Sequence, residues 1–367
     1  MQFHIVAQQD AIRAGEAALP RGGFRTPVFM PVGTRATVKA MGPEDLESMG
    51  ADIILSNAYH LYLRPGADIV ENLGGVQAFM GWNRLVLTDS GGYQIFSLKD
   101  LRKIRDDGVE FRSVVDGSAH FMTPEDNMRL QRALGSDIVM AFDVCPAADA
   151  PREEVVRALD LTTAWLRRCA AVDLKPHQRL FGIVQGGLDA ALRRQSAEQL
   201  MELDLPGYAI GGLSVGESQE QMLEVAEFTA GLLPANKPRY LMGVGMPLDI
   251  VRAAAVGIDM FDCVLPTRMA RNGTVFTPTG RLVVRAGAYK NDARPIQDDC
   301  PCPACRRFSR AYIRHLFNTG EIMGPRLATF HNLTFYATMM LRMREAVLQG
   351  RFAQWKNSFE DTYLSGG

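Results

Sequence analysis

The stretch Leu180-Phe-Gly-Ile-Val184, followed by Gln185-Gly-Gly187, joins a short apolar run to an abrupt turn of polar and glycine residues. A continuous apolar run of this length is typical of a strand buried on both faces of a parallel sheet. Seven further runs of this kind occur along the 367 residues: Val28–Val32, Asp52–Ser56, Leu85–Thr88, Ile138–Phe142, Tyr208–Ile210, Arg239–Met242 and Asp259–Asp262. The chain therefore predicts eight buried strands.

Helical patterns separate many of these runs. The segments with amphipathic periodicity are Pro151–Ala170, Leu188–Leu203 and Ser218–Leu233. The first begins at a proline, has two glutamates in its first turn and carries Arg167-Arg168 near its end, as helices commonly do. Strands that alternate with helices predict an α/β fold, here a (β/α)8 TIM barrel. No linker or repeat divides the chain, so residues 1–367 are expected to form a single barrel domain.

Three of the six cysteines lie within six residues, in Cys300-Pro-Cys302-Pro-Ala-Cys305, and His331 follows. Three thiolates and one imidazole match the tetrahedral ligand set of a closed structural Zn²⁺ site. A disulfide is disfavoured, because three clustered thiols cannot pair evenly. Incidental buried cysteines are the remaining alternative. A site filled by Cys300, Cys302, Cys305 and His331 leaves no open coordination position, so the metal should stabilise the fold and the chemistry should lie elsewhere.

Two segments interrupt the alternation of strands and helices. Residues 108–123 alternate apolar and polar side chains around a turn at Asp116-Gly117, which predicts a β-hairpin before a helix capped by Thr123-Pro124. Residues 281–331 contain the cysteine cluster and lie between the eighth run and a last helix near 325–348. We expect this second segment to be a zinc-binding subdomain inserted into the barrel near its C-terminus.

The composition is that of an ordinary soluble globular protein, with 47% hydrophobic and 22% charged residues. No apolar run approaches the roughly 18–20 residues that span a bilayer. The start of the chain, Met1-Gln-Phe-His-Ile, lacks the form of a signal peptide. The other cysteines, Cys145, Cys169 and Cys263, are scattered, which fits a reducing compartment. We therefore expect a cytoplasmic protein with no membrane partner.

Charge is distributed unevenly, although the net charge is only −1. Residues 264–351 carry 14 Lys/Arg against 5 Asp/Glu, and the rest of the chain is acidic. A basic zone of this kind is a reasonable footprint for phosphate contacts with a nucleic acid. A solvated helix face that carries Arg306, Arg307, Arg310 and Arg314 explains the charge equally well.

Acidic and amide residues follow the apolar runs. Asp89, Asp143 and Asp262 each close or follow one run, and Gln185 follows another. Barrel enzymes place their chemistry at the C-terminal ends of the strands, so these side chains should meet at one face. Each has a structural alternative. Asp89 can be a helix N-cap, Asp143 can cap the chain before Pro146, and Asp262 can be a buried structural acid, whereas glycines after Gln185 can simply mark a turn.

The predicted site has no metal ligands and no Ser–His pair, so it must work with carboxylates. Two carboxylates suggest one nucleophile and one general acid/base with a raised pKa. A carboxylate that attacks an anomeric carbon gives a covalent glycosyl-enzyme, and a second displacement restores the configuration. A third acid can accept from two neighbouring N–H donors, and Gln185 can donate to a carbonyl oxygen. Together these contacts match the hydrogen-bonding groups on the edge of guanine.

Four motifs and the cysteine cluster closely resemble those of the queuine tRNA-ribosyltransferases, also called tRNA-guanine transglycosylases. The motifs are Thr88-Asp-Ser-Gly-Gly-Tyr-Gln94, Ala209-Ile-Gly-Gly-Leu-Ser-Val-Gly-Glu217, Gly257-Ile-Asp-Met-Phe-Asp-Cys-Val264, and Pro266-Thr-Arg268 with Ala270-Arg-Asn-Gly273. The resemblance covers nearly the whole chain. It implies a (β/α)8 barrel with a zinc subdomain that exchanges the wobble guanine of a tRNA for a 7-deazaguanine base.

The resemblance also implies roles for the matching residues. Asp262 resembles the nucleophile that attacks the ribose C1′, and Asp89 resembles the general acid/base. The residues that resemble the base-binding set are Ser90, Gly91, Gly92, Tyr93, Asp143, Gln185, Gly212, Leu213 and Glu217. Within this set, Tyr93 resembles the ring that stacks on the base, and Glu217 resembles the acid that supports the Leu213 peptide.

Two further segments resemble the tRNA-contacting parts of the family: Gly243, Val244, Gly245, Met246, Pro247, Leu248 and Asp249, and then Thr267, Arg268, Met269, Ala270 and Arg271. Three positions depart from the family pattern. Met246 stands where lysine is customary, Leu248 replaces an acid, and Met269 stands where asparagine is common. The missing cation predicts weaker or less salt-sensitive tRNA binding than in relatives with the lysine.

Val215 and Cys145 resemble the bacterial form, whose pocket suits 7-aminomethyl-7-deazaguanine. The resemblance then implies a step of queuosine biosynthesis on tRNAs with G-U-N anticodons, a structural Zn²⁺ and a homodimer. Queuine- or archaeosine-type base exchange remains an alternative, as do a non-catalytic tRNA-binding subunit and a barrel glycosidase. A non-catalytic subunit would be expected to lack the nucleophile, whereas this chain has both Asp89 and Asp262.

Overall fold

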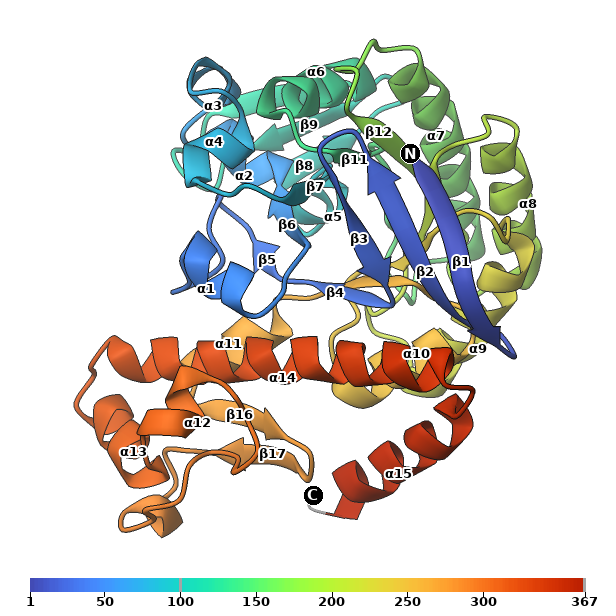
Figure 1. The fold of residues 1–367 in the computed structure, drawn as a ribbon. Helices are drawn as coiled ribbons and strands as arrows, with labels where there is room; N and C mark the ends of the chain where they lie inside the picture. The colour runs from blue at the N-terminus through green and yellow to red at the C-terminus, as the bar shows by residue number, and fades with distance from the viewer. Residues whose placement is uncertain (99–100, 366–367) are drawn as a thin grey trace.

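Nine parallel strands form one sheet in the computed structural model, which describes residues 1–98 and 101–365. The order across the sheet is β4-β15-β14-β13-β12-β11-β7-β6-β5. The bounds are β4 Val28–Met30, β5 Val32–Gly33, β6 Ile53–Asn57, β7 Leu85–Asp89, β11 Ile138–Met140, β12 Arg179–Val184, β13 Gly207–Ile210, β14 Arg239–Leu241 and β15 Met260–Asp262. The edge strands β4 and β5 are consecutive in the chain, so the sheet nearly closes into a barrel (Figure 1).

All eight apolar runs of the sequence contribute strands to this sheet, and the predicted α/β fold is confirmed. The first run differs in detail, because Pro31 divides it into β4 and β5. Proline has no N–H to donate to a neighbouring strand. Its carbonyl still accepts a hydrogen bond of 3.0 Å from the Leu55 N–H, so the chain stays within the sheet across the break.

Helices follow the strands and cover the outside of the barrel (Figure 1). Those between the strands are α1 Pro43–Ser48, α2 Ala58–Leu63, α3 Ala67–Asn72, α4 Val76–Met80, α5 Gly92–Phe96, α6 Pro124–Leu134, α7 Arg152–Ala170, α8 Ala190–Met201, α9 Gln219–Leu232 and α10 Pro247–Ala255. The three predicted amphipathic helices correspond to α7, α8 and α9, with ends that differ by one or two residues. Among the described residues, no helix has the length and apolar character that crossing a membrane requires.

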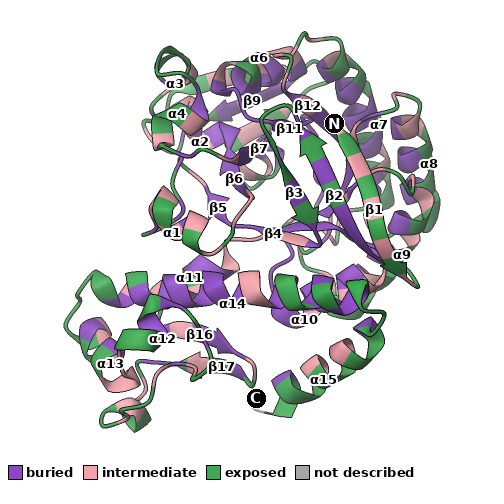
Figure 2. Ribbon diagram, viewed as in Figure 1, coloured by how far each residue is buried: buried purple, intermediate pink, exposed green. Residues whose placement is uncertain are grey.

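An N-terminal antiparallel sheet was not predicted. It consists of β1 Gln2–Gln9, β2 Ile12–Leu19 and β3 Gly22–Thr26. Leu19 and Phe24 of this sheet are buried in one cluster with Ile53 and Leu85, which begin barrel strands. The sheet therefore closes the barrel at the end where its strands start, and leaves the opposite end for a site. Figure 2 shows the contrast between the partly exposed β1 and the buried barrel strands.

The predicted hairpin is confirmed as β9 Val109–Arg112 and β10 Ala119–Met122, which pair in antiparallel fashion. A third strand, β8 Arg102–Ile104, pairs with β9 and was not predicted. The helix after the hairpin, α6, begins as expected, since the Thr123 hydroxyl accepts from the Asp126 N–H at 3.1 Å.

The C-terminal part extends below the barrel in Figure 1. Its elements are α11 Leu265–Arg271, β16 Thr274–Thr277, β17 Gly280–Val283, α12 Pro303–Arg307, α13 Arg310–Asn318, α14 Met323–Leu348 and α15 Phe352–Ser365. The helix predicted near 325–348 is α14. It is not the last helix, however, because α15 follows it. The signal for α15 lay in the sequence, since Phe352, Trp355, Phe359 and Tyr363 recur at helical spacing and stack on one another.

Candidate active site and metal site

The carboxyl ends of the parallel strands bring three acids together. Asp89 is the last residue of β7, Asp262 is the last residue of β15, and Asp143 lies just after β11. The charges of Asp143 and Asp262 both bear on Asp89, so the three carboxylates share one electrostatic environment. The expectation that these side chains meet at one face of the barrel agrees with this arrangement.

Asp89 is buried beside two like charges. Burial raises its pKa to about 7, and the charges of Asp143 and Asp262 act in the same direction. The Asn57 amide donates to its Oδ2 at 3.0 Å, while the Asn57 Oδ1 accepts from the N–H of His60 at the start of α2. Asn57 thereby orients the Asp89 carboxyl group. A carboxyl group with a pKa near neutrality can both give and take a proton at pH 7.

Among the described residues, one oxygen of Asp262 accepts two hydrogen bonds and the other accepts none. Its Oδ1 accepts from the Tyr240 hydroxyl at 2.7 Å and from the Gly243 N–H at 2.9 Å. Burial raises the pKa of Asp262, and these two donors oppose that rise. The pKa of Tyr240 lies well above its usual value because the phenol is buried beside Asp262, so the hydroxyl remains a donor. The geometry leaves Oδ2 available to attack an electrophile.

Asp143 and Gln185 form a buried pair. The Gln185 amide nitrogen donates to Asp143 Oδ2 at 2.7 Å. Burial raises the pKa of Asp143 to about 6 against the effect of this hydrogen bond. The Gln185 Oε1 is buried and has no partner among the described residues. A buried acceptor without a partner points to a ligand or an ordered water at this position.

Gly212 lies over Gln185 in a conformation that suits glycine. Its φ is +67°, and a Cβ at this position would lie 2.5 Å from Gln185 Oε1. Glu217 holds the peptide between Leu213 and Ser214. Its carboxylate accepts from the Ser214 N–H and, at 3.0 Å, from the Val215 N–H. Since the Ser214 N–H belongs to the same peptide as the Leu213 carbonyl, Glu217 fixes the direction of that carbonyl.

The segment after Asp89 packs tightly before it reaches Tyr93. The carbonyl of buried Ser90 accepts from the Asn127 amide at 2.7 Å. Gly91 has a φ of +84°, and a Cβ on Gly92 would lie 2.4 Å from Asp143 Oδ1. By contrast, the Tyr93 ring on α5 is 50% exposed. An exposed ring beside buried acids can accept a stacked base.

The two segments expected to contact tRNA are divided between surface and interior. Gly243 and Arg268 are exposed, whereas Met246, Leu248, Met269 and Arg271 are half-buried. The buried members are Val244, Gly245, Pro247, Asp249, Thr267 and Ala270. Direct contact is therefore open to the Gly243 backbone and to the side chains of Arg268, Met246, Leu248, Met269 and Arg271, whereas the buried members face the interior.

Replacing Asp89 with asparagine is expected to stabilise the protein at pH 8. The folded pKa of Asp89 is raised, so the native state binds more protons than the unfolded chain between about pH 4 and pH 7. The contribution of Asp89 to the free energy of unfolding therefore falls as the pH rises from about 4 to 7. Removing the charge should raise Tm by a few degrees at pH 8 and by less at pH 5. Thermal unfolding at both pH values tests this, with the exposed Asp173→Asn as control. A lower Tm for the Asp89 variant at pH 8 would contradict the expectation.

Cys300, Cys302, Cys305 and His331 form a buried cluster whose ligand atoms lie within 4.8 Å of one another. The His331 Nδ1 is 3.5, 3.8 and 3.2 Å from the Sγ atoms of Cys300, Cys302 and Cys305. A tetrahedral zinc site with standard bond lengths has edges of roughly 3.5–3.8 Å, so the residues fit such an ion. The His331 Nε2 lies 2.7 Å from the Phe276 carbonyl, which fixes the proton on Nε2 and leaves Nδ1 for a metal.

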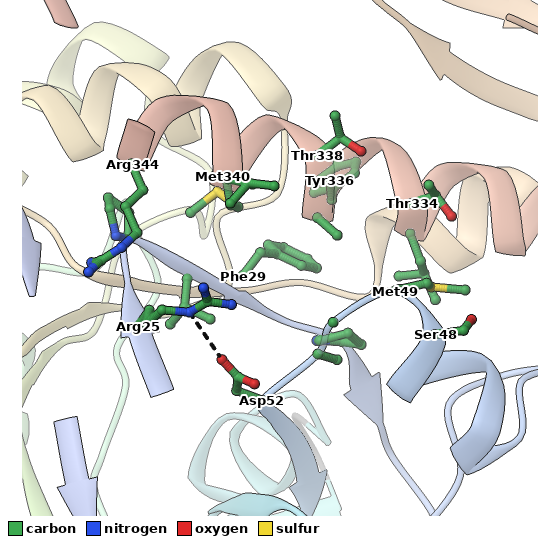
Figure 3. Close-up of a pocket in the computed structure, with 18 of the residues that line it drawn as sticks. Arg25, Phe29, Ser48, Met49, Asp52, Thr334, Tyr336, Thr338, Met340 and Arg344 are labelled. Atoms are coloured by element: carbon green, nitrogen blue, oxygen red, sulfur yellow. Dashed lines mark ion pairs between the residues drawn. The ribbon is translucent and has the colours of Figure 1, made fainter. Parts of the chain in front are cut away.

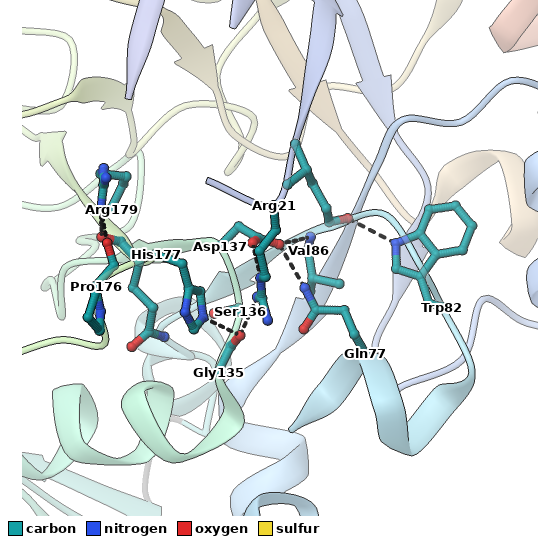
Figure 4. Close-up of polar contacts among 12 residues, drawn as sticks. Arg21, Gln77, Trp82, Val86, Gly135, Ser136, Asp137, Pro176, His177 and Arg179 are labelled. Atoms are coloured by element: carbon teal, nitrogen blue, oxygen red, sulfur yellow. Dashed lines mark hydrogen bonds and ion pairs between the residues drawn. The ribbon is translucent and has the colours of Figure 1, made fainter. Parts of the chain in front are cut away.

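One polar cluster and one cavity lie apart from the three acids at the strand ends. Asp137 precedes β11 at the opposite end of the barrel and accepts from Arg21 Nε, Gln77 Nε2 and the Val86 N–H at 2.7–2.9 Å (Figure 4). These contacts satisfy the carboxylate and tie neighbouring elements together. A cavity of about 250 Å³ lies between α14 and the segment around β4, and none of the three acids at the strand ends lines it (Figure 3).

Two residues that shape the site were missed from the sequence. Asn57 orients Asp89, and Tyr240 donates to Asp262. Tyr240 lies within a run that reads as buried strand, and its partner is 22 residues away in the chain. No local pattern assigns a role to either residue, although Asn57 directly follows the predicted run Asp52–Ser56 and so lies at a strand end.

Known proteins resemble this chain over its full length. A family model described as Queuine tRNA-ribosyltransferase matches residues 9–365. A queuine tRNA-ribosyltransferase of Halothermothrix orenii is 52% identical over 367 residues, covering 100% of this chain and 98% of the relative. One from Caldanaerobacter subterraneus subsp. tengcongensis is 54% identical over 362 residues, covering 98% and 96% of the two chains, and one from Bacillus licheniformis is 53% identical over 363 residues, covering 99% and 95%. These matches confirm the resemblance seen in the motifs, and the chain belongs to the queuine tRNA-ribosyltransferase family, whose members are pentosyltransferase enzymes.

Proposed function

We propose that this protein is a tRNA-guanine transglycosylase of the bacterial type. It exchanges the wobble guanine of tRNAs with G-U-N anticodons for 7-aminomethyl-7-deazaguanine, in queuosine biosynthesis. The observation that carries the proposal is the pairing of Asp262, with one held and one free oxygen, and Asp89, with a pKa near 7. Family membership supports the same assignment.

The proposed reaction is a double displacement. Asp262 Oδ2 attacks the ribose C1′, the bond from C1′ to the guanine nitrogen breaks, and Asp89 supplies a proton to the departing base. The incoming base then returns a proton to Asp89 as its ring nitrogen attacks C1′ and releases Asp262. A carboxyl group with a pKa of about 7 suits both directions of proton transfer. No redox cofactor is required, because the glycosidic bond energy is retained in the covalent ester.

The base-reading contacts follow from the buried pair and the loops beside it. Asp143 would accept paired N–H donors of the base. Gln185 and the Gly212 N–H would donate to its carbonyl oxygen, and the Leu213 carbonyl, held by Glu217, would accept from it. Ser90, Gly91 and Gly92 would lie beside the base, and Tyr93 would stack on its ring. Such contacts require the guanine to leave the anticodon stack.

Exchange of Met246 for lysine is expected to steepen the salt dependence of tRNA binding. Met246 is half-buried at the start of α10, three residues after exposed Gly243. One added phosphate contact should change the slope of log K against log salt by about 0.7–0.9. Binding titrations at several salt concentrations measure this slope. An unchanged slope would contradict the prediction that the absence of a lysine at position 246 weakens tRNA binding.

Several further features belong to this proposal. The Cys3His cluster would hold a structural Zn²⁺ in a subdomain at about 281–331, which is inserted into one barrel domain. The chain would act as a homodimer in the cytoplasm, where its six cysteines remain free thiols or metal ligands. Queuine- or archaeosine-type exchange and a non-catalytic tRNA-binding subunit are the competing possibilities.

The test is release of labelled guanine from the wobble position of a G-U-N tRNA, with and without 7-aminomethyl-7-deazaguanine. We expect release that depends on the added base. Queuine and the archaeosine precursor, each offered in competition, should be poorer substrates. Binding of tRNA without any release would favour a non-catalytic subunit and contradict the proposal.

A further inference from the structure

Arg193 on α8 is a fully buried cation, and its hydrogen bonds to the described residues all go to backbone carbonyls. Its relative exposure is 0%, and burial lowers its pKa to about 10, so it remains charged at neutral pH. Burying a charge is costly unless its donors are satisfied. The groups that accept from the guanidinium therefore indicate which part of the structure Arg193 stabilises.

The guanidinium joins the ends of two neighbouring barrel strands. At the end of β12, its Nη1 donates to the carbonyl of Val184, the last residue of the strand, at 3.0 Å, and its Nε donates to the Gly187 carbonyl at 2.8 Å. After β13, Nη1 donates to the Gly211 carbonyl at 2.7 Å, and Nη2 makes a longer contact of 3.5 Å with the Gly212 carbonyl. The rigid fork of arginine suits such a junction, which a lysine ammonium cannot reproduce.

These carbonyls determine where the neighbouring N–H groups point. The Gly211 carbonyl and the Gly212 N–H belong to one planar trans peptide, so a bond to the carbonyl directs the N–H away from Arg193. The same applies to the Val184 carbonyl and the Gln185 N–H, which donates to the Ser196 hydroxyl at 3.1 Å. Arg193 and Ser196, on one face of α8, therefore hold both ends of the Val184–Gln185 peptide. A hydrogen bond to a peptide carbonyl also strengthens its N–H as a donor.

We propose that Arg193 is a positioning residue that sets the recognition of the carbonyl oxygen of the base. It fixes the two donors assigned to that oxygen, the Gln185 side chain through its backbone and the Gly212 N–H through its peptide. Asp143, which reads the N–H groups of the base, receives no hydrogen bond from Arg193 among the described contacts, although the Gln185 amide donates to it at 2.7 Å. The Gly212 N–H is therefore the donor that Arg193 sets without involving Asp143. This inference rests on the proposed function.

The separation between oxygen recognition and N–H recognition gives a specific test. Guanine, 2-aminopurine and hypoxanthine compete with labelled guanine in exchange into tRNA. 2-Aminopurine lacks the carbonyl oxygen and the N1–H beside it, whereas hypoxanthine keeps both and lacks only the exocyclic amine. Each preference is therefore compared between variant and wild type, in which Asp143 is the same. In the Arg193→Lys variant, the preference for guanine over 2-aminopurine should fall about tenfold, which corresponds to about 1.4 kcal/mol. The preference for guanine over hypoxanthine and the KM for tRNA should change less than about twofold.

Arg194→Lys is the matched control, because Arg194 is the next residue of α8 but is exposed and lies over the Phe228 ring. This variant should behave as wild type. Ser196→Ala keeps the guanidinium and removes only the acceptor of the Gln185 N–H, so it should reduce the same preference by a smaller factor. It also keeps the inference testable if Arg193→Lys does not fold.

Two outcomes would overturn the inference. An unchanged guanine to 2-aminopurine ratio in both Arg193→Lys and Ser196→Ala would exclude a role in oxygen recognition. An equal loss of the preferences over 2-aminopurine and over hypoxanthine, together with a lower Tm, would show that Arg193 only stabilises the fold. If the wild-type protein exchanges no base at all, the proposed function fails instead, so the two failures are distinguishable.

Discussion

Replacing Asp262 with asparagine is expected to abolish base exchange, with a loss on the order of 10⁴-fold or more in kcat. An asparagine side chain has nearly the same shape and keeps an oxygen that can accept from Tyr240 and Gly243. It lacks a nucleophilic carboxylate oxygen, so no ester with the ribose C1′ can form. Single-turnover exchange and the covalent tRNA adduct on a denaturing gel measure the two consequences. Both should disappear together.

Asp173→Asn is the control for this variant, since Asp173 is exposed in the loop after α7. It should keep wild-type exchange and wild-type adduct. Because the Asp262 variant keeps the surrounding hydrogen bonds, its Tm should not fall below that of the wild type, and it should still bind tRNA. Exchange within tenfold of wild type in Asp262→Asn would exclude Asp262 as the nucleophile and require another acid of the cluster to take that role.

The barrel was readable from the sequence because its strands are buried on both faces. That burial produces continuous apolar runs, and the acids that interrupt them mark the strand ends. β1 was missed for the opposite reason. Its side chains alternate between exposed and half-buried positions, so no strong apolar pattern appears in Gln2–Gln9. The sheet it belongs to also lies outside the strand–helix alternation that identified the barrel.

The side chains that support the site could not be predicted from the sequence, because their partners lie far away in the chain. Tyr240 looks like any buried strand residue until the fold brings it to Asp262. Arg193 and Arg194 are adjacent arginines on one amphipathic helix, and no local pattern distinguishes them. The fold buries the first completely and leaves the second exposed. Motifs therefore indicated the groups that carry the chemistry, whereas only the three-dimensional structure identified those that hold them in place.

The four side chains of the cysteine cluster come from separate parts of the chain. Cys300 lies in a loop, Cys302 and Cys305 lie at the start of α12, and His331 lies within α14. His331 also contacts the Phe276 carbonyl of β16. A metal bound here would therefore join the loop, α12, α14 and, through His331, β16. Structural zinc contributes its binding free energy directly to folding.

Cys302→Ala is consequently expected to lose the metal and to lower Tm by about 10 °C or more, because the remaining ligands leave the tetrahedral set incomplete. Binding of tRNA should fall with it, since Arg306 and Arg307 of α12 belong to the same segment. Metal content, thermal unfolding and a tRNA gel shift measure the three effects. Cys169→Ala is the control, because it removes a buried thiol of α7 far from the cluster and should keep one zinc ion per chain. Pure, fully active wild-type protein without zinc would contradict this account, because the account makes the metal part of the folded structure around α12 and α14.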